Sequence, residues 1–167
     1  MIKLEKPDID VESIITDCTA NLTKQPILTH INASKTTIVS KSEKYNELAE
    51  KGQLGTLETH TMIEGGATKD DMVWLYDNKF VADGGRKYYD KIKAIPKYSK
   101  CPFCGVGIVS TLDHYLPKTK YPTYALTPVN LIACCADCNK IKKRRLVKRG
   151  IMNLYIHIMM ILMMKYG

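Results

Sequence analysis

The chain has 167 residues, of which 45% are hydrophobic and 25% charged, and its formal net charge is +8. This length suits one domain, or one small domain with an extension, and the composition is ordinary for a globular protein. The polar first residues, Met1 to Pro7, do not form a signal peptide, so a cytoplasmic location is expected. The apolar stretch from Ile151 to Met164 is shorter than the roughly 20 residues of a membrane span, so no membrane association is expected.

Residues 1–98 are predicted to be mainly helical. Helical segments are expected over residues 8–15, 42–51, 72–80 and 86–95. Ser42 is predicted to be the N-cap of the helix over residues 42–51. Residues 32–34 are predicted to be a break in the stretch of mixed polarity before this helix. The isolated histidines His30 and His60 have no neighbouring pattern that makes them ligands or catalysts.

Two CxxC pairs, Cys101–Cys104 and Cys135–Cys138, are the clearest motif of the chain. Thiols stay reduced in the cytosol, so six cysteines arranged in this way favour metal binding over disulfides. Four thiolates at this spacing suit one closed, tetrahedral, structural Zn²⁺ site that contributes folding free energy. Cys134 competes for a ligand position, but only Cys135 gives the CxxC spacing with Cys138.

The charge of the chain is unevenly distributed. Residues 1–85 carry 9 basic and 14 acidic side chains, a net charge of −5, whereas residues 86–149 carry 15 and 3, a net charge of +12. The second region therefore has the charge of a surface that binds a polyanion such as nucleic acid. The candidate phosphate contacts are Lys118, Lys120, Lys142 and Arg144. The alternative for each of these side chains is a solvated basic face.

An Asp113-His114 dipeptide lies between the CxxC pairs. A strand over residues 106–112 is expected to lead into it, several prolines then favour a loop, and a helix over residues 140–145 is expected to leave the second pair. A carboxylate beside an imidazole, with the Asn139 amide arriving from a distant segment, suits a hydrolytic metal site. Adjacent side chains on a strand point to opposite faces, so a shared site requires a twist or bend there.

These residues carry a family resemblance. Asp113-His114, Asn130 and Asn139, within CPFC…LDHYLPK…TPVNLIACCADCNKIKK, resemble the HNH endonucleases with a zinc-stapled ββα-metal core. The match covers about residues 99–143. The last position of the family pattern is often His, and Asn is a known variant there.

The resemblance implies an α+β fold and a division of the chain. A helical region (1–98), possible site of partner binding, would precede the ββα-metal nuclease domain (99–149) and a C-terminal tail (150–167).

The resemblance also implies roles for the residues. The chain would hydrolyse phosphodiester bonds, with DNA as the first candidate substrate. His114 would be the general base, since an imidazole accepts protons near neutral pH. Asp113 and Asn139 would offer oxygen ligands to a catalytic Mg²⁺ or Mn²⁺. Asn130 would orient the base by holding, through hydrogen bonds, the loop that carries His114.

A narrower resemblance rests on the sequence segments YLPKTKYP and PVNL. They are similar to segments of the small HNH subunit of Septu-type antiphage ATPase–nuclease pairs. It implies a role in antiphage defence and an ATPase partner, served by the acidic first 85 residues. Two readings without catalysis remain: a zinc-stapled nucleic-acid-binding module and a zinc-organised protein-interaction domain. A binding module without catalysis would not explain why the motif contains Asp113, His114 and Asn139. A RING-like module needs eight ligands, more than the motif region offers.

The last 16 residues contain five of the eight methionines of the chain. One reading is an apolar helix. A second comes from the genetic code: shifted by one base, a possible coding sequence of this segment reads as an acidic, surface-like peptide. We hypothesise that the chain is out of frame, or truncated, after His157.

Overall fold

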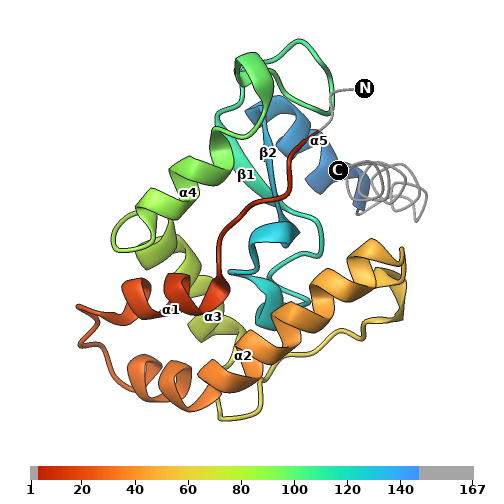
Figure 1. The fold of residues 1–167 in the computed structure, drawn as a ribbon. Coiled ribbons are helices and arrows are strands. Elements are labelled where there is room, and N and C mark those ends of the chain that lie inside the picture. The colour runs from red at the N-terminus through yellow and green to blue at the C-terminus, as the bar shows by residue number, and fades with distance from the viewer. Residues whose placement is uncertain (1–3, 147–167) are drawn as a thin grey trace.

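The computed structural model describes residues 4–146, and their side chains as far as residue 141. The helices in this part are α1 (Val11–Thr19), α2 (Ile27–Glu50), α3 (Lys69–Leu75), α4 (Arg86–Lys93) and α5 (Ala136–Leu146). The strands β1 (Thr111–His114) and β2 (Leu131–Cys134) form a two-stranded antiparallel sheet (Figure 1). The predicted α+β class is therefore confirmed. Within residues 4–146, no helix combines the length and apolar character needed to cross a bilayer.

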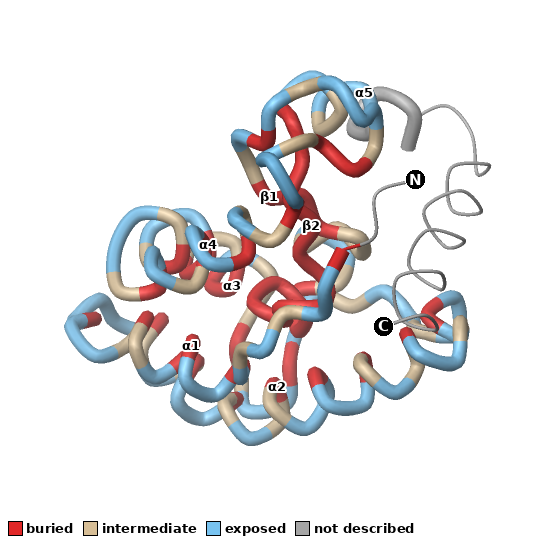
Figure 2. The backbone as a smooth tube through the Cα atoms, turned by 45° about the horizontal axis from the view of Figure 1, so that its top comes forward, coloured by how far each residue is buried: buried red, intermediate tan, exposed pale blue. Residues whose placement is uncertain are grey.

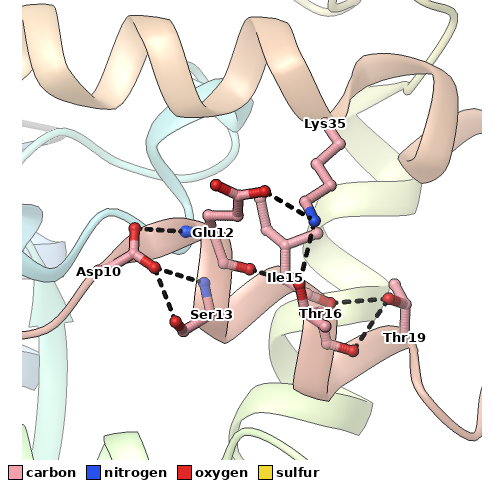
Figure 3. A network of polar contacts seen from close by, with 7 residues as sticks. All are labelled: Asp10, Glu12, Ser13, Ile15, Thr16, Thr19 and Lys35. Atoms are coloured by element: carbon pink, nitrogen blue, oxygen red, sulfur yellow. Dashed lines mark hydrogen bonds and ion pairs between the residues drawn. The ribbon is translucent and has the colours of Figure 1, made fainter.

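Helix α1 overlaps the helical segment predicted over residues 8–15, but it begins three residues later, at Val11, and continues to Thr19. The carboxylate of Asp10 accepts hydrogen bonds from the backbone N–H groups of Glu12 and Ser13, which caps the helix. Lys35 of α2 reaches across to the Thr16 hydroxyl at 3.0 Å and pairs with Glu12 at 3.1 Å (Figure 3). These contacts fix α1 against α2.

Helix α2 is continuous over 24 residues, so the predicted break and the predicted start at Ser42 are wrong. Its buried residues Ile31, Ile38 and Tyr45 are spaced seven apart and therefore lie on one face. Ser42 is on the buried face too, in the middle of the helix, and its hydroxyl is 2.7 Å from that of Thr127. The wide spacing of the apolar residues concealed the helix.

The small residues that suggested a break are contact residues instead. The Ser34 hydroxyl accepts a hydrogen bond from the Ala67 N–H, and a Cβ atom on Gly65 would lie 2.4 Å from the Ala33 carbonyl oxygen. The loop at Gly65 and Gly66 therefore approaches the α2 backbone closely, and small side chains permit this approach.

The two helices predicted over residues 72–80 and 86–95 are present. Helix α3 continues as one π-helical turn, Tyr76–Phe80, and its apolar residues Met72, Leu75 and Phe80 are fully buried. Their role in the core agrees with their helical spacing. The second helix, α4, ends two residues earlier than predicted.

The sheet differs from the prediction in the position of its first strand. The strand expected at residues 106–112 begins only at Thr111, so Asp113 and His114 lie in β1 itself, opposite Ile132 and Leu131 of β2. Residues 106–110 form the returning arm of a hairpin around the first CxxC pair instead. Val106 and Ile108 on this arm are exposed although they are apolar, which is why the pattern was misleading.

Among the described side chains, the hydrophobic core is built from all of these elements except α5. One buried cluster contains residues from Val11 in α1 to Ala133 in β2, and Figure 2 shows the buried positions gathered along the sheet and the inner faces of the helices. Helix α4 packs on β2, and α2 packs on the 3₁₀ turn Pro122–Tyr124. Residues on both sides of the domain boundary predicted between residues 98 and 99 therefore belong to one core. That boundary stays a prediction. The tail, residues 150–167, lies outside the described residues.

Candidate functional site

The four predicted cysteines lie together. The Sγ atoms of Cys101, Cys104, Cys135 and Cys138 are all within 4.8 Å of one another. The Sγ atoms of Cys104 and Cys135 are 3.9 Å apart. A tetrahedral zinc with Zn–S bonds of about 2.3 Å requires S···S separations of about 3.8 Å. This cysteine quartet is therefore compatible with a structural zinc ion, and it forms from the predicted four residues without Cys134.

The first cysteine pair lies in a tight hairpin whose backbone serves the thiols. The Cys101 N–H donates to the Gly107 carbonyl, and the Gly107 N–H donates to Cys104 Sγ at 3.3 Å. Hydrogen bonds from the N–H groups of Gly107 and Val106 lower the pKa of the Cys104 thiol to about 6. A thiolate is the form that binds metal, so the hairpin prepares Cys104 for that role.

The second cysteine pair joins β2 to α5. Cys135 follows the strand directly, whereas Cys138 and Asn139 lie in the first turns of the helix. The cysteine quartet therefore links the hairpin to the start of α5. Helix α5 also packs against β1, so the elements that carry Asn139 and Asp113 are neighbours.

The imidazole of His114 is buried and held in a defined orientation. Its Nε2 atom is 2.9 Å from the carbonyl oxygen of Ala125, and its ring centroid is 4.5 Å from that of Tyr76. A carbonyl oxygen only accepts, so Nε2 carries the proton of the neutral ring and Nδ1 is the basic nitrogen. Asp113, its neighbour in the strand, is equally buried. The bend expected between these two residues stays a prediction.

The Tyr76 ring lies beside both the His114 imidazole and the Lys118 ammonium. The Lys118 ammonium lies 4.2 Å from the centroid of the Tyr76 ring and forms an ion pair with Asp77. Burial raises the pKa of the Tyr76 hydroxyl, and the negative charges of Asp77 and Asp113 add to this effect. The Lys118 side chain is only 19% exposed, so it belongs to the surroundings of His114 and not to a solvated face.

Asn130 holds the loop that follows His114 in the chain. Its Oδ1 atom accepts from the Leu116 N–H at 2.7 Å and from the Tyr45 hydroxyl at 2.9 Å. Its Nδ2 atom donates to the carbonyl oxygens of Leu116 and Tyr124. The Tyr115 N–H donates to the Asn130 carbonyl as well. The side chain is completely buried, so these contacts fix the whole loop relative to β2 and α2.

Asn139 offers a carbonyl oxygen suited to a cation. Its Oδ1 atom is buried and has no hydrogen-bond partner among the described residues, which is costly for a polar atom. A hard cation such as Mg²⁺ binds to oxygen, commonly to one or two carboxylates with water completing the shell. The Asp113 carboxylate and the Asn139 amide oxygen fit that donor set.

The remaining predicted residues are less closely tied to the site. Lys120 is exposed, and its carbonyl accepts a hydrogen bond from the His60 N–H. Lys142 and Arg144 lie on α5, but their side chains are outside the described part. The sequence prediction missed Tyr45 and Tyr76 as site residues. Their spacing marks them as core, and nothing local indicates which distant polar residue each one contacts.

Together these features define an α+β protein in which a cysteine quartet, able to hold a metal ion, adjoins buried Asp, His and Asn side chains. Among known proteins, Protein ea31 of Escherichia phage lambda is 31% identical to the chain over 148 residues. The alignment covers 83% of this chain and 50% of the phage protein, so the chain spans about half the length of that relative. No family model and no solved structure matches the chain.

Proposed function

We propose that the chain is a metal-dependent HNH endonuclease that hydrolyses phosphodiester bonds of nucleic acid, with DNA as the first substrate. One observation carries the proposal. The residues of the HNH resemblance lie on successive, mutually packed elements: Asp113 and His114 on β1, Asn130 before β2 and Asn139 on α5. A binding module without catalysis would not require a buried imidazole oriented by a carbonyl group.

His114 is the general base of this proposal. Its Nδ1 atom accepts a proton from the water that attacks phosphorus, because Nε2 keeps its own proton for the Ala125 carbonyl. The same carbonyl stabilises the imidazolium that results, since it accepts from a more strongly polarised N–H. Asn130 acts indirectly, because it holds both the loop after His114 and the Tyr124 carbonyl one residue before Ala125.

Asp113 and Asn139 are the proposed ligands of Mg²⁺ or Mn²⁺. When bound there, such an ion supplies positive charge to the oxygen that leaves phosphorus. The four cysteines would hold Zn²⁺ and take no part in the reaction. Lys118 and Lys120, which follow β1, would contact phosphates and position the strand, as would Lys142 and Arg144 of α5.

The decisive variant is His114→Ala. We expect it to reduce cleavage of plasmid DNA at least ~100-fold with Mg²⁺ or Mn²⁺, since a positioned general base contributes about 10²–10⁴-fold. It should retain one zinc per chain and its affinity for nucleic acid. Cleavage is followed on gels with single-stranded DNA, double-stranded DNA and tRNA. Residual activity equal to that of the unmodified chain would remove His114 from the mechanism.

A histidine control separates this role from a general loss of fold. His30 lies on α2, contacts Asp71 at 2.9 Å and is not one of the proposed catalytic or metal-binding residues, so His30→Gln should leave cleavage unchanged. If the unmodified chain binds DNA but cuts no nucleic acid with either ion, the chain is the zinc-stapled binding module. If it binds none, the protein-interaction alternative is favoured.

The biological setting is a second part of the proposal. The likeness to Septu-type pairs supports an ATPase partner and a role in antiphage defence, and the acidic residues 1–85 supply a surface opposite in charge to the basic half. Copurification of the chain with a coexpressed ATPase of this type tests the partnership.

A further inference from the structure

The hairpin around the first CxxC pair presents apolar side chains to solvent. We call residues 97–109 the knuckle hairpin; its arms are joined by a hydrogen bond from the Val109 N–H to the Ser99 carbonyl. The Tyr98 side chain is 90% exposed, and on the opposite arm Val106 is 76% and Ile108 59% exposed. These are three of the five large hydrophobic residues that are exposed in the described part of the chain. The knuckle hairpin therefore concentrates apolar surface that the fold does not use.

The backbone at Tyr98 is also unfavourable. Tyr98 has φ of 57° and Ser99 has φ of 52°, so two consecutive residues other than glycine occupy the left-handed region. Glycine or asparagine would adopt this conformation at less cost. An aromatic residue that is both strained and exposed gives no packing stabilisation in return. Such combinations are concentrated at binding sites, where the benefit comes from the ligand.

The charge around Tyr98 identifies the kind of ligand. No acidic residue occurs between Lys91 and Leu112, whereas lysines flank the tyrosine. Lys97 is exposed and adjacent to Tyr98, and the Lys100 ammonium lies over the same hairpin, bonded to the Val106 carbonyl. An aromatic ring beside lysines is the combination with which proteins bind single-stranded nucleic acid, by stacking on bases and contacting phosphates.

The knuckle hairpin adjoins the other basic element of the chain. The cysteine quartet joins it to α5, and Figure 1 shows the green hairpin and the blue helix at the same end of the molecule. Lys140, near the start of α5, is exposed there. A nucleic acid strand on α5 would therefore have the knuckle hairpin beside it.

We propose that the knuckle hairpin is a nucleic-acid contact in which the Tyr98 ring stacks on an unpaired base while Lys97 and Lys100 contact the flanking phosphates. An unpaired base is required because the bases of an intact duplex already stack on both neighbours. The inference takes the class of ligand, nucleic acid, from the proposed function, but it requires no cleavage. It predicts that single-stranded DNA binds more tightly than blunt duplex.

The test is binding of labelled oligothymidylate to the full zinc-loaded chain without Mg²⁺ or Mn²⁺, measured by fluorescence anisotropy. Tyr98→Ala should weaken binding roughly 5- to 150-fold, the range measured when stacking aromatics are truncated, and Tyr98→Phe should not. Met62→Ala is the matched control, because Met62 is 64% exposed elsewhere and carries no such role. Unchanged binding by Tyr98→Ala overturns the proposal.

Salt dependence distinguishes stacking from charge. Each phosphate contact on a single strand contributes about 0.7 to the slope of log affinity against log salt. Lys97→Gln and Lys100→Gln should each lower the slope by about that amount, whereas Tyr98→Ala should leave it unchanged. Lys41→Gln, at an exposed lysine of α2, is the control for net charge. Equal slopes for all three lysine variants would contradict the phosphate contacts.

A last variant separates binding from stability. Tyr98→Gly relieves the positive φ, so its thermal midpoint should equal or exceed that of the unmodified chain while its affinity falls. A parallel fall of both would indicate a structural role and overturn the proposal. The two proposals can fail separately. If Tyr98→Ala loses affinity but the unmodified chain cleaves no nucleic acid, the nuclease proposal is refuted and the Tyr98 contact is supported. If Tyr98→Ala keeps its affinity and cleavage depends on His114, the Tyr98 contact is refuted and the nuclease proposal is supported.

Discussion

Asn130 uses the full hydrogen-bonding capacity of its side chain inside the protein. Two donors reach Oδ1, from Leu116 and Tyr45, and Nδ2 donates to two carbonyl oxygens. Two of these bonds hold the backbone of Leu116 in the loop after His114, and the other two reach Tyr45 of α2 and the Tyr124 carbonyl. Truncation would therefore leave several buried polar groups unsatisfied, each at a cost of about 1–3 kcal/mol.

This arrangement predicts a graded effect on stability. Asn130→Ala should lower the free energy of unfolding by several kcal/mol, whereas Tyr45→Phe should lower it by about 0.5–1.5 kcal/mol, because Oδ1 keeps its bond from Leu116. Urea denaturation of the zinc-loaded chain measures both. Tyr98→Phe removes an exposed hydroxyl and is the control. A cost for Tyr45→Phe as large as that for Asn130→Ala would mean that Tyr45 acts mainly through packing.

At the residue scale, local motifs were predictable and distant partners were not. Asn130 was identified by resemblance, and its predicted task of holding the loop agrees with its hydrogen bonds. Tyr45 was not identified, because 85 residues separate it from Asn130 and its spacing indicates only a core position. The spacing of two CxxC pairs indicates that the four thiols lie close together in the fold. A tyrosine in a helix gives no such indication of the residue that it contacts.

At the scale of elements, the cysteine quartet holds the hairpin and α5 together, and Gly107 makes this possible. A Cβ atom at Gly107 would lie 2.9 Å from both Cβ and Sγ of Cys135, too close for real side chains. The N–H of Gly107 also donates to Cys104. Any side chain here would push the two CxxC pairs apart.

Gly107→Ala should therefore weaken zinc binding about 10- to 100-fold, the usual effect of a change just outside a metal's ligands. Zinc per chain is measured after competition with a chromogenic chelator. Gly55→Ala is the control, since nothing lies within 4 Å of the added carbon there. Zinc affinity that is equal in the two variants would show that the hairpin adapts, and would contradict the close packing.

The boundaries of elements were predicted well where an apolar pattern is dense. Helix α3 follows such a pattern, whereas α4 lies between the glycines at 84 and 85 and Pro96, which limit it on both sides. The continuity of α2 was missed because Ala33 and Ser34 read as turn residues, although they are small in order to admit the loop at Gly65. The strand expected at residues 106–112 was misplaced for the opposite reason, since Val106 and Ile108 are apolar but exposed.

For the molecule as a whole, the helical half and the sheet form one core. Leu112, Leu131 and Ala133 of the sheet belong to the same buried cluster as residues of α1 to α4. Buried hydrogen bonds from Ser42 and Tyr45 of α2 reach residues 127 and 130. The charge asymmetry of the sequence suggested two regions with separate tasks. Packing also makes the acidic half a support for the loop and strand that carry His114.

The last prediction concerns whether residues 99–149 fold without that support. In this fragment the apolar face of the sheet, with Leu112 and Leu131, would lose the helices that cover it, and zinc constrains only the hairpin and the start of α5. Burial of apolar area is the main stabilising contribution in small domains, so zinc alone should not produce a native fold. We expect poor dispersion in the NMR spectrum of the fragment with zinc, and recovery of dispersion when residues 1–98 are coexpressed. A well-dispersed spectrum of the isolated fragment, with cleavage that depends on His114, would establish the predicted boundary at residues 98–99 as that of an autonomous domain.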